Sequence, residues 1–413
     1  MNIFYITQHY PPEIGAAQAR AYDMSKNLAE KGHTVTVLTA FPNDKVAKRL
    51  FRVEKRSGVT VKRSFMIRDT KKSSIRRLLN YISFMMSSMI SGLFMKKPDV
   101  IFATTPPLFV GVSGYVLSRI HRTKFVIEVR DLWVDFAEVL NQINNNFLLR
   151  AARKLEYFLY KRADKIITVT HGYKERLIFN GIPKDKIEVI TNGVDPAELN
   201  SQNNVEPKKV KNEIGVSEDS FIILYAGNHG AAQGLHVVLD AAQRLKEYPK
   251  ITFLFIGDGV EKQALVKRAK SEHLSNVIFL DAKKKEELND YYQIADLCLV
   301  SLKKHPLFDI TIPSKLFDCM AMGKPVLIGV NGEAKQIVAE LNAGFHFLPE
   351  DSNSLVEQIL YAYHHPSELE KIEKNIRSNM LEKYDRRLLS NKLEEILNQT
   401  VFHRTRLTKG DND

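Results

Sequence analysis

The feature that most constrains this chain is an alternation of short apolar runs with longer amphipathic stretches. The runs are rich in Val and Ile, and the stretches between them have helical spacing. Because parallel strands need a crossover, which is usually a helix, this alternation predicts parallel sheets covered by helices. The expected strands are 2–7, 33–39, 99–103, 125–129, 165–169, 186–190, 221–226, 251–257, 276–280, 297–301 and 325–328.

A polar stretch at 196–217, rich in Asn, Lys, Ser and Glu, separates two copies of this pattern. On each side of it the pattern begins with a strand, a glycine-containing loop and a helix. A chain of 413 residues has room for two domains. We therefore expect an α/β protein with two facing Rossmann-like domains, at 1–195 and 218–380, with a linker at 196–217 and a cleft between the domains.

Composition excludes several classes of protein. With 44% hydrophobic and 26% charged residues, the chain has the composition of a globular protein. Its two cysteines cannot form a disulfide framework, and no Cys or His cluster has the spacing of a zinc site. The opening residues, MNIFYITQHYPP, lack the basic and apolar regions of a signal peptide. We therefore expect a cytoplasmic protein.

The net charge of +12 is concentrated in residues 45–77, which hold thirteen Lys and Arg and two acids. Such a patch suits an anionic partner such as a membrane, phosphates or nucleic acid, or it is a solvated basic face. The candidate membrane-contact residues are Lys71, Lys72, Arg76 and Arg77.

Residues 78–95 follow without a single charge. Polar side chains recur there every three or four residues, and an apolar stripe lies opposite them. The segment therefore predicts an amphipathic helix rather than a membrane span. This helix either covers a sheet or contacts a membrane. The polar stripe consists of Arg76, Asn80, Ser83, Ser87 and Ser91.

Three glycine-containing loops follow expected strands. Gly15 lies where a backbone amide can approach an anion at a helix N-terminus, although a plain turn explains it equally well. In the loop 227–234, Gly227, Asn228 and Gly230 suit close approach to a phosphate. His229 either donates a hydrogen bond to that phosphate or is a solvated loop residue. Gly257 permits a tight turn at the carboxyl end of its strand.

A charged segment near residue 314 opens another expected helix. Ser314 can cap this helix, and Lys315 adds positive charge beside the helix amides. Asp318 lies one turn further, where a carboxylate can accept two ribose hydroxyls. The alternative is a capped helix with a surface Lys–Asp pair.

A second charged cluster ends the strand at 125–129. Glu128, Arg130 and Asp131 follow apolar residues, and buried charges are costly unless they are paired or face a cleft. His171 lies at the end of the next expected strand. A structural pair between Arg130 and either acid is the alternative to a functional role.

These motifs, in this order, resemble the retaining GT-B glycosyltransferases of family 4 over nearly the whole chain. The version with Arg130-Asp131-Leu132-Trp133 looks most like a bacterial subgroup that includes N-acetyl-L-fucosaminyltransferases. With that fold, we expect a helix at 381–400 that packs back on the first domain. The motifs that carry the resemblance are Pro11-Pro12 with Gly15, 105–108, 130–133, 192–195, 227–234 and 313–325.

The resemblance implies that the second domain holds a nucleotide sugar. Asp318 matches the second acid of the family's Glu-x7-Glu motif, whereas Ile310 occupies the position of the first acid and Asp309 is adjacent. Gln233 replaces the family's phosphate-binding lysine. The expected donor-binding residues are Gly15, Gly227, Asn228, Gly230, Gly257, Asp309, Ile312, Pro313, Ser314 and Asp318. The expected catalytic residues are Lys315, His229, Asp131 and His171, with Arg130 on the acceptor side.

The implied function is transfer of a sugar such as N-acetylfucosamine from a UDP-linked donor to a polyprenyl-diphosphate-linked saccharide, in capsule or O-antigen synthesis. The enzyme is expected to work without a metal or other cofactor, at the anionic inner leaflet of the cell membrane. The alternatives are a nucleotide-sugar epimerase of the same fold, a non-catalytic membrane-associated partner of a glycan-synthesis complex, and a nucleic-acid-binding protein. The basic segment beside an amphipathic helix disfavours the epimerase, and the lack of interleaved aromatic residues disfavours nucleic acid.

Overall fold

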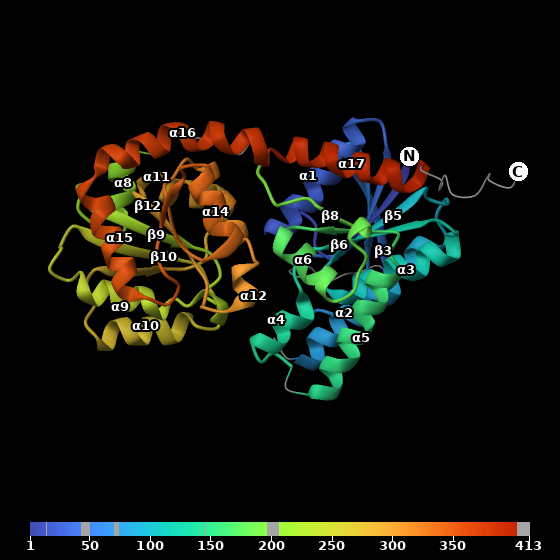
Figure 1. Ribbon diagram of the computed structural model, residues 1–413, viewed down its shortest axis with the longest axis horizontal. Coiled ribbons are helices and arrows are strands. Elements are labelled where there is room, and N and C mark those ends of the chain that lie inside the picture. The colour runs from blue at the N-terminus through green and yellow to red at the C-terminus, as the bar shows by residue number, and fades with distance from the viewer. Residues whose placement is uncertain (14, 43–49, 70–73, 144, 196–205, 403–413) are drawn as a thin grey trace, which may run out of the picture. The chain divides into compact units, whose positions relative to one another are not determined.

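A computed structural model describes the chain except for residues 14, 43–49, 70–73, 144, 196–205 and 403–413. The chain forms two compact units (Figure 1). Unit 1 comprises 1–191 and 386–413, and unit 2 comprises 192–385. The expected fold class, two Rossmann-like α/β domains with parallel sheets, is confirmed.

Unit 1 is built on an eight-stranded sheet in the order β3-β4-β2-β1-β5-β6-β7-β8. All neighbouring strands are parallel except β3 and β4. The strands are β1 (Asn2–Ile6), β2 (Thr34–Ala40), β3 (Phe51–Arg56), β4 (Val59–Ser64), β5 (Val100–Thr105), β6 (Lys124–Val129), β7 (Lys165–Thr168) and β8 (Ile187–Val189). The helices are α1 (Ala16–Glu30), α2 (Ser74–Leu93), α3 (Leu108–His121), α4 (Trp133–Val139), α5 (Asn146–Arg162), α6 (His171–Phe179) and α17 (Arg386–Phe402), with a 3-10 turn at Lys184–Lys186.

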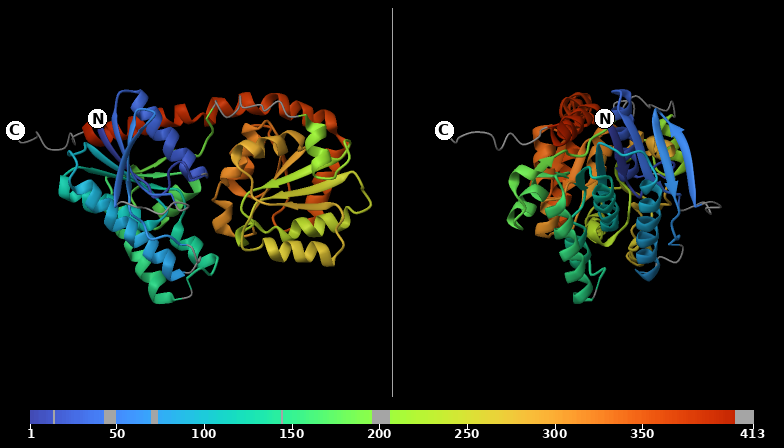
Figure 2. Two further views of the ribbon diagram at one scale, coloured as in Figure 1. Left: turned by 180° about the vertical axis from the view of Figure 1, so that it is seen from behind. Right: turned by 90° about the vertical axis from the view of Figure 1, so that its right-hand side faces the viewer.

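Helices cover both faces of the unit 1 sheet. Helices α1 and α17 lie together on one side, and α2, α3 and α5 lie on the other (Figures 1 and 2). Buried apolar residues of β1, β2, β5, α1 and α17 form one core, which includes Tyr5, Met24 and Leu393. Because both faces are covered, the central strands are apolar on both faces, as the sequence pattern requires.

Helix α17 is attached to unit 1 by polar contacts as well as by this core. Arg386 pairs with Asp23 of α1, and both side chains are only 8% exposed. Glu394 contacts Lys31 at 2.6 Å and His33 at 2.8 Å. The helix expected at 381–400 is therefore α17, which begins at Arg386 and packs on the other elements of unit 1.

Unit 2 has a six-stranded parallel sheet in the order β11-β10-β9-β12-β13-β14. Helices α9 and α10 lie below this sheet in Figure 1, and α8 and α11 lie above it. The strands are β9 (Phe221–Ala226), β10 (Ile251–Ile256), β11 (Val277–Leu280), β12 (Leu297–Ser301), β13 (Val326–Gly329) and β14 (Gly344–His346). The helices are α8 (Pro207–Glu213), α9 (His236–Arg244), α10 (Lys262–Ser271), α11 (Lys285–Ile294), α12 (Pro306–Asp309), α13 (Ser314–Ala321), α14 (Gly332–Glu340), α15 (Ser352–His364) and α16 (Pro366–Tyr384), with a 3-10 turn at Ala231–Gln233.

Two regions differ from the sequence-based expectation. Part of the expected linker is helix α8, which buries Val210 and packs on α11, so it belongs to unit 2. Part of the basic segment is the antiparallel pair β3–β4 at the sheet edge. Charged side chains at an edge strand discourage pairing with other chains, and they also hide the apolar alternation that marks a strand.

Candidate active site

The carboxyl ends of β9 and β12 are the place in unit 2 where a ligand site is expected. These two strands are neighbours although they are not consecutive, so the chain reverses direction across the sheet there. Ligands of open α/β sheets bind at such a point. The loops after the two strands are joined by hydrogen bonds: Ser301 Oγ donates to the carbonyl of Gln233 (2.8 Å), and the amide of Lys303 donates to the carbonyl of Ala232 (2.9 Å).

Glycines let the loop after β9 approach the loop after β10. A Cβ on Gly257 would lie 1.9 Å from the carbonyl oxygen of Gly227, and one on Gly259 would lie 2.3 Å from that of His229. The amide of His229 donates to the carbonyl of Asp258 at 2.8 Å, which fixes the contact. The two glycine motifs of the sequence therefore form one structure at the sheet edge.

Lys315 lies against this loop from the first turn of α13. Its Nζ donates to the hydroxyl of Tyr225 at 2.5 Å and lies 3.8 Å from the centre of that ring. A Cβ on Gly227 would lie 3.3 Å from the same Nζ, so the glycine leaves room for the ammonium. Tyr225 Oη in turn donates to the carbonyl of Asn228 at 2.6 Å. A lysine held at a helix N-terminus in this way is suited to bind an anion.

The ammonium of Lys315 is poorly solvated. Burial lowers the pKa of Lys315 to about 7, although the thiol of Cys319 and the carboxyl of Asp318 act in the opposite direction. A bound diphosphate would supply the negative charge that this position lacks and would favour the ammonium form.

His229 is buried, which contradicts one of the two roles that the sequence allowed, that of a solvated loop residue. Its side chain is fully buried, with its ring centroid 5.5 Å from that of Tyr225 and 6.1 Å from that of Phe255. Neither ring nitrogen has a hydrogen-bond partner among the described residues. Burial lowers the pKa of His229 to about 4, with a further lowering by Lys262 and Lys315. The residue is therefore not a solvated loop histidine, and a hydrogen bond from it to a donor phosphate stays a prediction.

Helix α13 also begins one residue earlier than expected. Its N-cap is Pro313, without a side-chain cap, so Ser314 is the first helical residue and not the cap. Asp318 follows one turn after Lys315 on the same helix. Asp309 is the last residue of α12, and its carbonyl oxygen would lie 1.9 Å from a Cβ on Gly332, whose φ is +64°.

The remaining donor-binding candidates of unit 2 lie on the same loops. Ile312 is buried, whereas Pro313 is half-buried. Gly230 lies between Asn228 and Gln233, and its amide donates to Gln233 Oε1 at 3.1 Å. Gln233, in the position of the family's lysine, therefore contributes to the shape of the loop.

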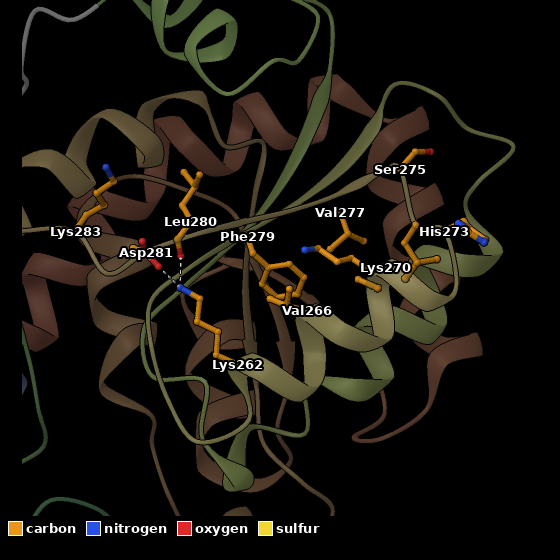
Figure 3. Close-up of a pocket in the computed structure, with 12 residues that line it drawn as sticks. Lys262, Val266, Lys270, His273, Ser275, Val277, Phe279, Leu280, Asp281 and Lys283 are labelled. Carbon is orange, nitrogen blue, oxygen red and sulfur yellow. Dashed lines mark hydrogen bonds and ion pairs between the residues drawn. The ribbon is translucent and has the colours of Figure 1, made fainter. Parts of the chain in front are cut away.

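Lys262 is a residue that the sequence analysis missed. Its Nζ donates to the carbonyls of Gly257 (2.8 Å) and Leu280 (3.0 Å) and contacts Asp281 at 2.7 Å (Figure 3). It also lines a cavity of about 780 Å³ between α10 and β11, with Lys270 and Lys283. Tyr225 was also missed. Both residues adjoin the glycine loops in the sequence, but only the fold shows that Tyr225 contacts Lys315 and that Lys262 contacts the end of β11.

Unit 1 places Arg130 and Asp131 directly after the carboxyl end of β6, and Gly15 in the segment between β1 and α1. Gly15 is exposed and immediately precedes α1. Arg130 donates from Nη2 to the carbonyl of Pro106 at 3.0 Å, which orients its guanidinium. Burial raises the pKa of Asp131 to about 6, while Arg130 lowers it. A carboxyl group with this pKa is suited to exchange a proton near neutral pH.

Glu128 has a structural role. It pairs with Arg20 of α1 at 2.8 Å and accepts from Thr104 Oγ1 at 2.6 Å, with both ion-pair partners buried. Although burial alone would raise it, Arg20 holds the pKa of Glu128 below its usual value. Arg20 also donates to the carbonyls of Ile190 and Thr191. The pairing of Glu128 with Arg130 that was considered from the sequence is therefore wrong.

The other unit 1 candidates are dispersed. His171 does not end a strand but begins α6, after the N-cap Thr170, and it is exposed. Arg76 and Arg77 lie on α2, whereas Lys71 and Lys72 fall outside the described residues. Within the described ranges, no group of three or more His, Cys, Asp or Glu side chains could hold a metal ion.

Comparison with known proteins identifies the family. Residues 17–198 match the model described as Glycosyltransferase Family 4, and residues 207–379 match Glycosyl transferases group 1. WcaI of Escherichia coli, provisionally named a colanic acid biosynthesis glycosyl transferase, is 26% identical over 79% of this chain and 83% of its own length. The alpha-monoglucosyldiacylglycerol synthase of Acholeplasma laidlawii is 22% identical over 91% of each chain.

A solved structure agrees with this assignment at the level of the fold. HepE of Anabaena, in complex with UDP and glucose, superposes with a TM-score of 0.73 at 18% identity and covers 96% of this chain and 99% of its own. The two family matches together span most of both units, and the two Rossmann-like units have the matching architecture. The chain is therefore a GT-B glycosyltransferase with a family 4-type first half and a group 1-type second half.

Proposed function

We propose that this chain is a retaining glycosyltransferase that moves a sugar from a UDP-linked donor to a polyprenyl-diphosphate-linked saccharide during surface-polysaccharide synthesis. The observation that carries the proposal is the ammonium of Lys315, held between Tyr225 and Gly227 at the edge of the unit 2 sheet. The complex of HepE with UDP supports a UDP-linked donor. The names of the E. coli and A. laidlawii relatives support a polysaccharide or glycolipid product.

The proposed chemistry follows from where charge develops. When the bond between the sugar and UDP breaks, negative charge grows on the departing phosphate, and a preorganised cation lowers the barrier. Lys315 and the amides of the first turn of α13 supply that stabilisation. The sugar becomes oxocarbenium-like, as in glycoside hydrolysis, and the departing phosphate assists removal of the acceptor proton on the same face. In this proposal Asp318 binds the ribose hydroxyls.

The sugar and the place of action complete the proposal. The sequence Arg130-Asp131-Leu132-Trp133 resembles the N-acetylfucosaminyltransferase subgroup, so we propose an N-acetylated deoxyhexosamine as the sugar. Use of a lipid-linked acceptor places the enzyme at the inner leaflet of the cell membrane, as a peripheral protein. No metal or other cofactor takes part in the proposed reaction.

The test is nucleotide release from a panel of UDP-, GDP- and dTDP-sugars, with and without a lipid-linked acceptor. We expect acceptor-dependent release of UDP, and we expect Lys315→Ala to lower kcat more than it raises KM, because its charge acts mainly in the transition state. Lys371→Ala, at an exposed position of α16, is the control. An epimerised nucleotide sugar without release would favour the epimerase, and no turnover of any donor by folded protein would favour the non-catalytic partner.

A further inference from the structure

Lys262 occupies a place in helix α10 that the helix itself does not favour. It is the first residue of α10, whose first turn holds no acidic residue and whose N-cap, Glu261, makes no side-chain cap. The helix dipole makes a cation unfavourable at this end of a helix. The side chain of Lys262 is also only 15% exposed, and removing an ammonium from water is costly. Contacts outside α10 therefore have to offset both costs.

The ammonium of Lys262 has as many acceptors as it has hydrogen atoms (Figure 3). Its Nζ donates to the carbonyl of Gly257 at 2.8 Å, to the carbonyl of Leu280 at 3.0 Å and to Asp281 Oδ1 at 2.7 Å. A lysine has three donors and no acceptor, so this arrangement leaves no donor unused. Asp281 is 98% exposed, and an exposed ion pair contributes little to stability. The two carbonyls are therefore the partners that matter most.

The backbone alone joins the ends of β10 and β11 weakly. Gly257 follows β10 and Leu280 ends β11, and the hydrogen bond from the amide of Gly257 to the carbonyl of Leu280 is longer than usual, at 3.3 Å. Strand β11 is also an edge strand, so in the described sheet it pairs with β10 only. Lys262 adds a hydrogen bond to a carbonyl on each side of this junction. The lysine therefore holds the loop after β10 to the end of β11.

The loop after β10 in turn holds the backbone of the glycine loop after β9. The amide of His229 donates to the carbonyl of Asp258 at 2.8 Å, and the carbonyl of His229 accepts from the amide of Glu261 at 2.9 Å. Both polar backbone groups of His229 are thus bound by the residues that directly precede Lys262. The charge of Lys262 also reaches this loop, since Lys262 and Lys315 both lower the pKa of His229. A movement of the loop after β10 would therefore move the loop after β9.

We propose that Lys262 is a positioning residue of the donor site: it fixes the loop after β10 to the end of β11, and through that loop it fixes the loop after β9 beside Lys315. The inference rests on the proposed function and deepens it, because it adds a residue that acts on the diphosphate through the protein. Lys315 stabilises the phosphate charge directly. Lys262, whose ammonium already has its acceptors within the protein, keeps the binding loop in place.

Hydrogen–deuterium exchange tests the contact between the loops without any ligand. Lys262→Met removes the donors and keeps a side chain of similar length. Lys270→Met is the matched control, since Lys270 is exposed on the same helix and lines the same cavity. We expect faster exchange in Lys262→Met at the amides of Gly257, His229 and Glu261, which join the loops, and wild-type exchange in the control. Unchanged exchange would overturn the proposal, and so would an equal acceleration in the core strands β9 and β12, which would indicate a general loss of stability.

Calorimetry of UDP binding, well below the Tm of each variant, tests whether these contacts serve the donor site. We expect Lys262→Met to raise the Kd of UDP about tenfold, because a displaced binding group loses much of its effect. Lys262→Arg should recover most of that loss, because a guanidinium keeps the charge and several donors. Asp281→Asn and the control Lys270→Met should stay within about twofold of the wild-type Kd.

The outcomes separate this inference from the proposed function. Faster loop exchange in Lys262→Met with an unchanged Kd for UDP would overturn the role of Lys262 in donor binding. Failure of the folded wild type to bind UDP would overturn the proposed donor instead, and the exchange experiment would still decide whether Lys262 holds the loops. If Lys262→Met does not fold, Lys262→Gln replaces it under the same criteria, because its neutral amide is one bond shorter and keeps only two donors.

Discussion

Binding of UDP should draw a proton onto Lys315. In the unliganded protein the pKa of Lys315 is lowered to about 7, so at pH 8 only about a tenth of the side chain is protonated. A diphosphate beside the amine favours the ammonium and raises its pKa toward the ordinary value of 10.5. At pH 8 binding should therefore take up about 0.8–0.9 of a proton. At pH 6 the lysine is already charged, and its uptake falls to about 0.1 of a proton.

The assay is calorimetry of UDP binding at pH 8 in buffers with different ionisation enthalpies, because the slope of heat against ionisation enthalpy gives the protons taken up. The diphosphate is fully ionised at this pH and contributes little to the slope. Two variants isolate the lysine: Lys315→Met removes the titrating group, and Lys315→Arg keeps a charge that does not titrate. Both should show a slope near zero at pH 8. Measurable binding by the wild type with no dependence on the buffer would refute the placement of Lys315 against the diphosphate.

Three further predictions concern stability. Lys315→Met should raise Tm at pH 7, because the pKa of Lys315 is lower in the folded than in the unfolded protein, so folding disfavours the ammonium. This gain in Tm should shrink between pH 7 and about pH 10, because the lysine of the unfolded protein also loses its proton there. An equal gain at both pH values would contradict this reasoning. Gly257→Ala should lower Tm more than Gly215→Ala. Both glycines have positive φ, but only a Cβ on Gly257 would meet a carbonyl oxygen, at 1.9 Å. Equal losses in a thermal melt would show that the loops after β9 and β10 move apart freely. Arg386→Ala should cost about 3–5 kcal/mol in urea denaturation because it leaves Asp23 buried without its partner, whereas Lys31→Ala, at an ion pair that is partly exposed, should cost at most about 1 kcal/mol.

The sequence predicted the elements whose physical signal is local. The strands of both sheets appear within a few residues of their expected positions, because parallel strands buried on both faces are continuous apolar runs. The β3–β4 pair was missed because Arg52, Lys55 and Arg56 interrupt the apolar alternation on an edge strand. Strand β14 was missed because its three residues are too few to show the apolar run that predicts a strand.

The candidate site could be predicted only in part, because its chemistry depends on tertiary contacts. The glycine loops and Lys315 were found from their own neighbours in the sequence. Tyr225, ninety residues before Lys315, could not be connected to it, and nothing in the sequence shows that aromatic rings of β10 and β11 bury His229. Burial decides whether a histidine or lysine is charged, and burial is a property of the fold.

Helix α2 shows that a correctly predicted amphipathic pattern does not by itself tell which side of the helix faces the protein. The sequence shows both stripes, but which of them faces the protein depends on the hydrogen-bonding groups that the neighbouring segments present to the helix. Gln8, the carbonyls of Phe65 and Ile67, and Ser113 of α3 present hydrogen-bonding groups to α2, so its polar side chains satisfy buried partners that apolar ones would leave unpaired. A helix that keeps its polar contacts inward leaves its apolar side chains on the outer side, where six of them on α2 are exposed: Ile75, Leu78, Leu79, Met86, Ile90 and Leu93. The hydrogen bonds that hold α2 on unit 1 therefore also decide which of its two stripes is exposed.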